Sequence, residues 1–301
     1  MQQRDFRSTL LHSGLLTEGG VEGIYLRSPA FESVVRGVEA MISRVANVPV
    51  ASRYFLPPII PLSALEGAGY HRSFPNLVGV ITSFTGSDSD LPEYLRRIQD
   101  NEEWTQGLST IDISLCSAAC HQIYPLHSHR RVRDDGVTYE VQASCFRHEP
   151  SSDPARMQSF RMQEIVLIGS EKAAFDHRES WLPRAAALLE GLGLDITQEV
   201  ANDPFFGRPG RVLKRGQLEK ELKFELLAPI GGNGLVAIAS ANYHEDHMGH
   251  GFDISLDSGG PAHSACMGFG LDRVALALIS VHGVELESWP TPVRQQLFAS
   301  L

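Results

Sequence analysis

The stretch from residue 140 to residue 169 restricts the fold of this chain more than any other. Residues 141–146 and 162–168 are largely apolar, and the run between them contains the turn-forming sequence Pro-Ser-Ser-Asp-Pro. Two apolar arms around a turn cluster predict an antiparallel hairpin. Arg147 and Glu149 follow the first arm two residues apart, so their side chains share one face of an extended strand.

The returning arm adds further charges to this hairpin, at Arg156, Arg161 and Glu164. A hairpin at the edge of a sheet can carry such charges merely to stay solvated. Charges gathered at the end of a hairpin also suit a charged ligand. The remainder of the chain favours the second interpretation.

The composition is that of an ordinary globular protein, with 43% hydrophobic residues among 301, enough for a proper core. We expect a cytoplasmic protein without membrane association, because there is no run of about 18 apolar residues and no apolar centre of a signal peptide. The net charge of −10 argues mildly against a broad nucleic-acid-binding surface. Four cysteines are too few for a disulfide scaffold, which leaves reduced thiols or metal ligands.

Residues 29–47 have apolar side chains at three- and four-residue spacing, which predicts an amphipathic helix of about four turns. The apolar positions are Phe31, Val34, Val35, Val38, Met41, Ile42 and Val45. Residues 48–56 predict a strand that ends at a Pro-Pro pair. Residues 1–30, with a short helix and a Gly-Gly turn, are expected to form a lead-in.

Three further segments have recognisable patterns. Residues 181–192 predict a helix, with Ser180 as its N-cap and Gly193 as its stop. Residues 222–229 and 234–242 predict two paired strands around a Gly-Gly-Asn turn. The segment His-Glu-Asp-His that begins at residue 244 spaces its histidines three apart rather than four as in HExxH, so we interpret it as a structural or substrate-lining loop.

A polar insertion at residues 202–222 carries a basic run, which is unusual in so acidic a chain. The run consists of Arg208, Arg211, Lys214 and Arg215. A solvated helix or loop face would explain these charges, and so would a docking surface for an acidic partner. Both interpretations stay open at this point.

The hairpin resembles motif 2 of class II aminoacyl-tRNA synthetases, in which Phe-Arg-any-Glu precedes a variable loop and a second phenylalanine. Residues 146–149 (Phe-Arg-His-Glu) and Phe160 occupy those places. The resemblance implies that Arg147 holds the ATP α-phosphate, Glu149 meets the adenine edge and Phe160 stacks on the adenine. A guanidinium makes paired hydrogen bonds to phosphate, and an aromatic ring offers a base a stacking surface.

Residues 264–278 resemble motif 3 of the same class, a glycine-rich strand that turns into a helix carrying Arg273. The glycines let the backbone approach phosphate, and the resemblance implies that Arg273 clamps the γ-phosphate. Arg147 and Arg273 are therefore the candidate catalytic residues. Arg156 and Met157 would fold over the nucleotide.

Residues 31–58 resemble motif 1, the dimer-forming element, and residues 56–70 resemble the seryl branch of the class. Together the motifs imply an α+β fold, a single catalytic domain over residues 1–301 with an antiparallel β-sheet flanked by helices. They also imply a homodimer. No tRNA-binding domain is expected.

The strands after the insertion resemble those that border the nucleotide in seryl enzymes. The nucleotide-binding residues implied there are Lys223, Ala237, Ile238, Ala239 and Ser240. Ala237 stands where those enzymes have an acidic residue that helps to hold magnesium. Glu225 is then the nearest acidic candidate for the magnesium that accompanies ATP.

Cys120, Glu164 and Cys266 match the places at which methanogen-type seryl enzymes supply zinc ligands. Two thiolates and a carboxylate leave one position of a tetrahedral zinc open, which is the pattern of a catalytic site. The resemblance implies that the amine of the substrate takes this position. Glu164, His121 and Asn242 are the implied substrate-binding residues.

The remaining cysteines, Cys116 and Cys145, match no such place. A structural Cys-x3-Cys site at Cys116 and Cys120 is the alternative for the metal. It requires two further ligands, which the sequence does not identify.

A seryl-like catalytic domain with these zinc positions and no tRNA-binding module resembles the bacterial amino acid:[carrier protein] ligases. The resemblance implies ATP-dependent activation of glycine or alanine to the aminoacyl-adenylate, with release of pyrophosphate. It implies transfer to the phosphopantetheine thiol of an acidic carrier protein, for which the basic run is the candidate docking surface. Two alternatives stay open: a seryl-like synthetase that charges tRNA, and a non-catalytic regulator that binds amino acid or ATP.

Overall fold

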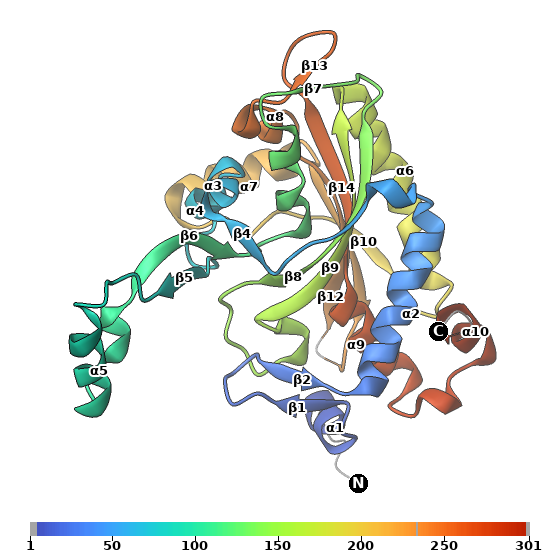
Figure 1. Cartoon of the computed structure of the whole chain (residues 1–301). Helices are drawn as coiled ribbons and strands as arrows, with labels where there is room; N and C mark the ends of the chain where they lie inside the picture. Colours follow the sequence, from blue (N-terminus) through green and yellow to red (C-terminus); the bar gives the residue numbers. More distant parts are fainter. Residues whose placement is uncertain (1–4, 233, 299–301) are drawn as a thin grey trace.

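A seven-stranded sheet forms the centre of the computed structural model, which describes residues 5–232 and 234–298 (Figure 1). The strand order is β10-β11-β12-β14-β9-β8-β3. All neighbouring strands are antiparallel except β3 and β8, which are parallel. The strands are β3 (Arg53–Phe55), β8 (Val137–Phe146), β9 (Ser159–Gly169), β10 (Thr197–Val200), β11 (Lys223–Pro229), β12 (Leu235–Tyr243) and β14 (His263–Gly270).

The predicted hairpin is confirmed as β8 and β9. The two strands are paired from Val137 opposite Ile168 to Phe146 opposite Ser159. Their connection contains the short helix η5 (Pro154–Arg156). Because β9 also pairs with β14, the hairpin lies inside the sheet and is not a solvated edge. The paired strands β11 and β12 are confirmed as well.

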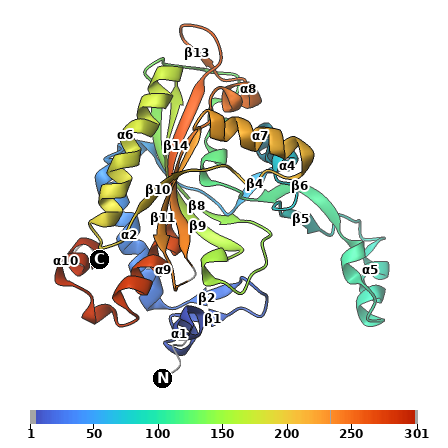
Figure 2. The ribbon, with the colours of Figure 1, turned by 180° about the vertical axis from the view of Figure 1, so that it is seen from behind.

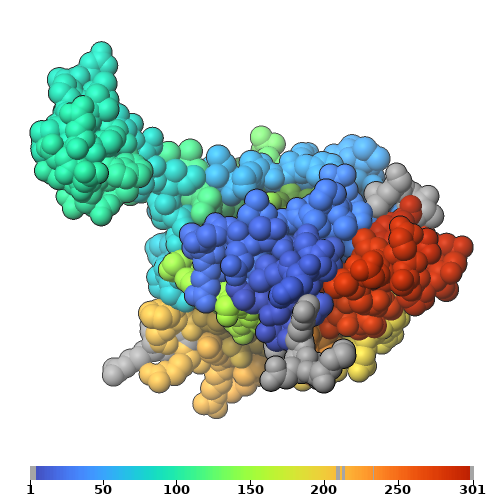
Figure 3. Space-filling view, turned by 90° about the horizontal axis from the view of Figure 1, so that it is seen from below, coloured from blue at the N-terminus to red at the C-terminus, as the bar shows by residue number. Residues whose placement is uncertain are grey.

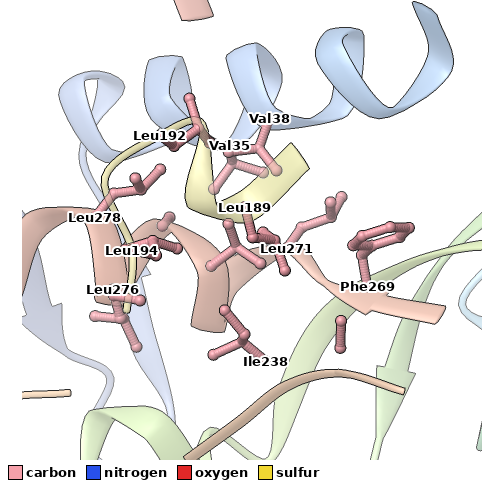
Figure 4. Packing of buried hydrophobic residues seen from close by; sticks show 14 of the residues in the cluster. Val35, Val38, Leu189, Leu192, Leu194, Ile238, Phe269, Leu271, Leu276 and Leu278 are labelled. Atoms are coloured by element: carbon pink, nitrogen blue, oxygen red, sulfur yellow. The ribbon is translucent and has the colours of Figure 1, made fainter. Parts of the chain in front are cut away.

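Helices α2 (Pro29–Ala46), α6 (Glu171–Glu190), α9 (Leu271–His282) and α10 (Thr291–Phe298) cover one face of the sheet (Figures 1 and 2). The main hydrophobic core lies under them. Figure 4 shows side chains of Val38, Leu189, Ile238, Phe269 and Leu271 gathered there. Burying each of the larger side chains contributes about 1.5–3 kcal/mol, so this layer is the main source of stability.

The helix predicted over residues 29–47 is confirmed as α2. The hydroxyl of Ser28 caps its start by accepting a hydrogen bond from the backbone N–H of Phe31 at 3.2 Å. It ends at Asn47, which adopts a left-handed conformation with φ of 50°.

The helix predicted over residues 181–192 is longer at its start, and both predicted boundary residues are wrong. Ser170 is the cap of α6, and Ser180 lies inside the helix, where its hydroxyl donates to a backbone carbonyl at 2.9 Å. The helix ends before Gly193. Apolar spacing missed the first turns because their buried side is formed partly by His177 and Arg178.

The N-terminal region is more than a lead-in. It forms α1 (Phe6–His12), β1 (Leu16–Glu18) and β2 (Tyr25–Arg27), and β1 pairs with β2. Leu10 and Leu16 are almost fully buried in the main core. The strand predicted over residues 48–56 is shorter than expected, with the short helix η1 (Val50–Ser52) ahead of β3.

Elements of the middle of the chain lie on the opposite face of the sheet (Figure 1). They include α3 (Leu62–Gly67), α4 (Tyr70–Ser73), η3 (Ala119–Gln122), η4 (Tyr124–His127), α7 (Gly207–Glu219) and α8 (His247–Phe252). The basic run is therefore helical, and the segment expected to be a loop after residue 244 contains α8. β7 (Arg131–Val132) and β13 (Ser255–Leu256) form a parallel pair. The short helix η6 (Leu286–Ser288) belongs to the other side of the sheet, with Leu286 packed against the main core.

An arm protrudes from the body of the molecule (Figures 1 and 3). Its base is a three-stranded sheet of β4 (Ile59–Pro61), β6 (Ser109–Leu115) and β5 (Val80–Ser83), and it continues into α5 (Leu91–Gln99) and η2 (Trp104–Gly107). None of the helices in the described part of the chain has the length and apolar character that crossing a membrane requires.

Candidate active site

Three buried side chains from separate elements meet on the sheet face that carries η3. They are Cys120 of η3, Glu164 of β9 and Cys266 of β14, and their ligand atoms all lie within 4.8 Å of one another. Glu164 is opposite Gly268 in the ladder, so Glu164 and Cys266 point to the same face. Oε1 of Glu164 accepts hydrogen bonds from the backbone N–H groups of Ala119 (2.8 Å) and Cys120 (3.3 Å), which hold η3 against the strands.

This group concentrates acidic side chains in a buried place. Burial raises the pKa of Glu164 to about 8, and the nearby Cys266 adds to that shift. The hydrogen bond between the two thiols lowers the pKa of Cys266 well below its usual value and raises that of Cys120. A bound cation would offset the electrostatic cost of this arrangement. Thiolates and a carboxylate are donors that zinc prefers, so the residues fit a metal ion.

The structure separates Cys116 from this group. Its sulfur lies 4.0 Å from the sulfur of Cys145, and Gln122 Nε2 donates to it at 3.4 Å. Cys116 and Cys120 therefore face different partners. Among the described residues, no further ligands gather at Cys116, so the alternative Cys-x3-Cys metal site is not formed there.

Two implied substrate-binding residues lie beside the group. Nδ2 of Asn242 is 3.4 Å from the sulfur of Cys266, which it faces across the ladder. His121 follows Cys120 in η3, and its Nδ1 lies 2.8 Å from the hydroxyl of Ser117. Burial lowers the pKa of His121 to about 3, so its ring is neutral near pH 7.

His244 is a site residue that the sequence did not assign. Its Nε2 lies 3.7 Å from the sulfur of Cys266. Its Nδ1 is held by the hydroxyls of Ser264 at 3.0 Å and Tyr124 at 3.3 Å. The segment predicted to be a structural or substrate-lining loop thus places one histidine against Cys266 of the metal-type group, which consists of Cys120, Glu164 and Cys266. Its spacing could not reveal this, because the partners are distant in the sequence.

Arg147 lies directly after β8, and its guanidinium stacks over the ring of Phe160 at 5.2 Å. Phe160 and Glu164 are four residues apart on β9, on the same face and about 13 Å apart along the strand. The backbone N–H of Glu149 donates to the carbonyl of Arg147 at 2.8 Å, so the chain bends here instead of continuing the predicted strand. Because Arg147 stacks on Phe160 and Phe160 shares a face of β9 with Glu164, Arg147 and Glu164 lie on the same face of the sheet.

The two residues expected to fold over the nucleotide differ in position. Arg156 is exposed at the end of η5. Met157 is buried in the main core, with Nη2 of Arg27 at 3.4 Å from its sulfur. The Met157 side chain cannot cover a nucleotide without leaving that core.

Arg273 connects the start of α9 to two parts of the site. Its Nε donates to the carbonyl of Ala155 at 2.7 Å, and its Nη1 donates to the carbonyl of Ala237 at 3.0 Å. Burial, with contributions from Arg147 and Arg156, lowers its pKa to about 10, so it stays charged near pH 7. Three arginines that influence one another in this way suit a ligand with several negative charges.

Lys223 is buried and already paired. Its ammonium forms ion pairs with Asp203 at 2.6 Å and Glu225 at 3.0 Å. Burial by itself would lower the pKa of Lys223, but these carboxylates raise it. Asp203 is a second site residue that the sequence did not assign. Glu225, the candidate magnesium ligand, and Asp203 both form ion pairs with Lys223.

The implied nucleotide positions on β12 also differ from one another. The side chains of Ile238 and Ala239 are buried in the main core. Ala237 and Ser240 are partly exposed. Ile238 and Ala239 would therefore contact a nucleotide through their backbone and not through their side chains.

Asp272, which precedes Arg273, anchors the start of α9. It is almost fully buried and forms ion pairs with Arg27 at 2.8 Å and Arg161 at 2.7 Å. It also accepts a hydrogen bond from the backbone N–H of Arg161 at 2.6 Å. Arg161 reaches on to Glu32 of α2 at 2.5 Å. This network joins β2, β9, α2 and α9 behind the candidate site.

These features define a class II aminoacyl-tRNA synthetase catalytic domain. The crystal structure of the Methanopyrus kandleri seryl-tRNA synthetase, in complex with Aquifex aeolicus tRNASec, matches 99% of this chain and 61% of that chain. The TM-score is 0.83 at 19% sequence identity. The predicted α+β fold, an antiparallel sheet flanked by helices, is confirmed. No protein-family model matches the chain.

Two curated relatives narrow the class to a family. Amino acid–[acyl-carrier-protein] ligase 1 of Bradyrhizobium diazoefficiens is 39% identical over 280 residues, covering 92% of this chain and 86% of the relative. Ligase 2 of the same organism is 40% identical over 289 residues, covering 95% of this chain and 86% of the relative. The chain belongs to the amino acid–[acyl-carrier-protein] ligase family, as its motifs indicated.

The Asp272 network leads to a prediction on stability. Asp272→Asn should lower the free energy of unfolding by about 2–4 kcal/mol, because Arg27 and Arg161 lose a buried counterion. Asp176→Asn removes an exposed carboxylate that pairs with Lys172, and should change stability by less than about 0.5 kcal/mol. Urea denaturation measures both. Equal, small effects would contradict the anchoring role of Asp272.

Proposed function

We propose that this chain activates glycine or alanine with ATP to the aminoacyl-adenylate and transfers the aminoacyl group to the phosphopantetheine thiol of a carrier protein. The observation that supports this most is the arrangement on β9. The metal-type group at Glu164 and the arginine stack at Phe160 share one face of that strand. An amino acid whose amine is held at the metal-type group would direct its carboxylate toward a phosphate held by Arg147.

The proposed chemistry has two steps. A zinc ion bound at the group would act as a Lewis acid that holds the neutral amine. When the carboxylate attacks the α-phosphorus, the bond to the bridging oxygen breaks and pyrophosphate leaves, and Arg147 and Arg273 would stabilise the charge that develops on the phosphate oxygens. The thiol then attacks the carbonyl carbon of the adenylate and AMP leaves. No side chain forms a covalent intermediate.

ATP would bring magnesium, for which Ala237 and Glu225 are the positions to consider. Ala237 offers no side-chain oxygen. Glu225 is the acidic candidate, and its pairing with Lys223 means that it would have to be shared with the ion.

Activity assays test the proposed function against its alternatives. The protein should catalyse pyrophosphate exchange with glycine or alanine, and larger amino acids should be excluded sterically, because one methyl group contributes only about 1–3 kcal/mol of attraction. It should then load a holo-carrier protein and leave bulk tRNA uncharged. Charging of tRNA with the carrier left unmodified would favour the seryl-like synthetase. Absence of amino-acid-dependent exchange would favour the non-catalytic regulator.

For the metal we propose zinc, about one ion per chain, since three protein ligands leave an open tetrahedral position. Cys120→Ser, Glu164→Ala and Cys266→Ser should each lose it. Cys116→Ser is the matched control and should keep it, because that sulfur pairs with Cys145 instead. Elemental analysis of the purified proteins measures the content. Zinc retained in Cys266→Ser, or lost in Cys116→Ser, would exclude this ligand set.

We further propose that the chain forms a homodimer through the region of residues 31–58. β3 is the edge strand of the central sheet, so one side of its backbone has no neighbouring strand within residues 5–232 and 234–298. Phe55, the last residue of β3, is 80% exposed, and Val50 of the preceding η1 is 81% exposed. A free strand edge flanked by exposed apolar side chains favours contact with another protein surface.

The proposed docking surface for the carrier protein is the basic run on α7. Arg211 is exposed and Lys214 is half-buried, and a spacing of three residues places them on one side of the helix. Arg215 is partly neutralised by Glu219 at 2.7 Å. The side chain of Arg208 lies outside the described part of the structure. Arg211 and Lys214 therefore supply the clearest positive charge for an acidic partner.

Charge reversal tests this surface. Arg211→Glu with Lys214→Glu should slow carrier loading and spare pyrophosphate exchange, because only the second step needs the partner. Raising the salt concentration from about 0.1 M to about 1 M should act likewise, since the screening length falls from about 10 Å to about 3 Å.

The matched control is Arg133→Glu with Lys172→Glu, which makes the same charge change outside α7 at two exposed residues. It should leave both steps unchanged. Loading at the wild-type rate in the α7 variant would mean that the carrier docks elsewhere. Equal loss of both steps would mean that α7 belongs to the catalytic site.

A further inference from the structure

Tyr70, the first residue of α4, has a buried hydroxyl that bonds to nothing in the described part of the protein. The residue is 7% exposed, and its hydroxyl oxygen has no hydrogen-bond partner there. An unsatisfied buried hydroxyl costs about 1–3 kcal/mol, so native proteins keep one mainly where it has a function. Tyr124, which is also buried, differs because its hydroxyl reaches His244 and Ser264.

The ring of Tyr70 is held in place from two sides. It packs against Phe74 with ring centroids 4.8 Å apart, and against His121, edge to face, at 5.7 Å. Phe74 in turn stacks on Phe205 at 5.1 Å. Contacts of this kind fix the direction of the hydroxyl, so its lack of a partner is a property of the packing and not of a mobile side chain.

Tyr70 contacts one half of the candidate active site and lies within the electrostatic influence of the other. Its ring contacts His121, which is adjacent to Cys120, and Tyr70 belongs to the same buried cluster as Cys120 and Cys266. Arg147 acts on its hydroxyl electrostatically, and Nε of Arg147 is itself buried without a hydrogen-bond partner among the described residues. Burial raises the pKa of Tyr70 to about 12, so the phenol keeps its proton near pH 7 and can donate.

We propose that the Tyr70 hydroxyl donates a hydrogen bond to the amino acid carboxylate, to the oxygen that becomes the carbonyl oxygen of the adenylate. This rests on the proposed function. In that reaction the carboxylate lies between the amine at the metal-type group and the phosphate at Arg147, and Tyr70 is buried in one cluster with Cys120 and Cys266, within the electrostatic influence of Arg147. The same oxygen gains negative charge when the thiol attacks, so the hydrogen bond would strengthen in the transition state.

Tyr70→Phe removes this hydroxyl and keeps the ring that packs on Phe74 and His121. The thermal stability should stay at or above that of the wild type, because no protein hydrogen bond is lost. In pyrophosphate exchange, kcat/KM for the amino acid should fall about 10- to 100-fold, with the KM for ATP unchanged, because a hydrogen bond to the charged carboxylate is lost. Tyr94→Phe on the protruding arm, where Tyr94 contacts Phe84, is the matched control and should change neither value.

Two analogues of the adenylate separate a direct contact from a structural effect. An aminoacyl-sulfamoyl adenosine keeps the carbonyl oxygen, and an amino-alcohol ester of AMP has a methylene group in its place. By calorimetry, Tyr70→Phe should weaken binding of the first about tenfold and leave binding of the second unchanged.

Equal weakening of both analogues, or of neither, would overturn the assignment of Tyr70 while the wild-type enzyme still performs exchange. A wild-type protein that shows no exchange and binds neither analogue would instead overturn the proposed function, and the role of Tyr70 with it. The two failures are therefore distinguishable.

Discussion

The register of β9 between β8 and β14 is the constraint on which the rest of the structure depends. Alternate residues of this central strand serve opposite faces. Phe160 and Glu164 point toward the candidate site, whereas Arg161 and Ile165 point toward α2 and the main core. A shift by one residue would turn Glu164 into the apolar core and Ile165 toward the candidate site. Ladders on both sides of β9 exclude such a shift.

Buried charged groups have counterions on the face of the sheet that carries the main core, whereas acidic groups lie together on the face that carries the candidate site. Behind the sheet, Asp272 is neutralised by Arg27 and Arg161, so the start of α9 is fixed without any ligand. In front of it, Glu164 and Cys266 bring acidic groups together, and their shifted pKa values reflect that proximity. The paired charges behind the sheet fix the scaffold, and the acidic groups in front of it are suited to bind a cation. Adjacent residues at the start of α9 illustrate the division, since Asp272 is paired and Arg273 reaches into the site.

Residues outside the sheet complete the site by packing onto its front face. Segments η3 and α4 bring Cys120, His121 and Tyr70 together through aromatic contacts and backbone hydrogen bonds to Glu164. The same side of the molecule carries α7 (Figure 2). Arg211 and Lys214 belong to this helix. A carrier protein docked there would approach the sheet face on which the chemistry is proposed.

Periodicity in the sequence determined the hairpin and α2, because those signals are local. The resemblance to the family's motifs indicated Arg147, Arg273 and the three metal-type residues as site residues. Tertiary structure alone decided the rest. It turned Cys116 toward Cys145, buried Met157 in the core, and brought His244 to Cys266. It also extended α6 through turns whose buried side includes a histidine and an arginine. In each case the partner is distant in the sequence or polar, so apolar spacing has no means of indicating it.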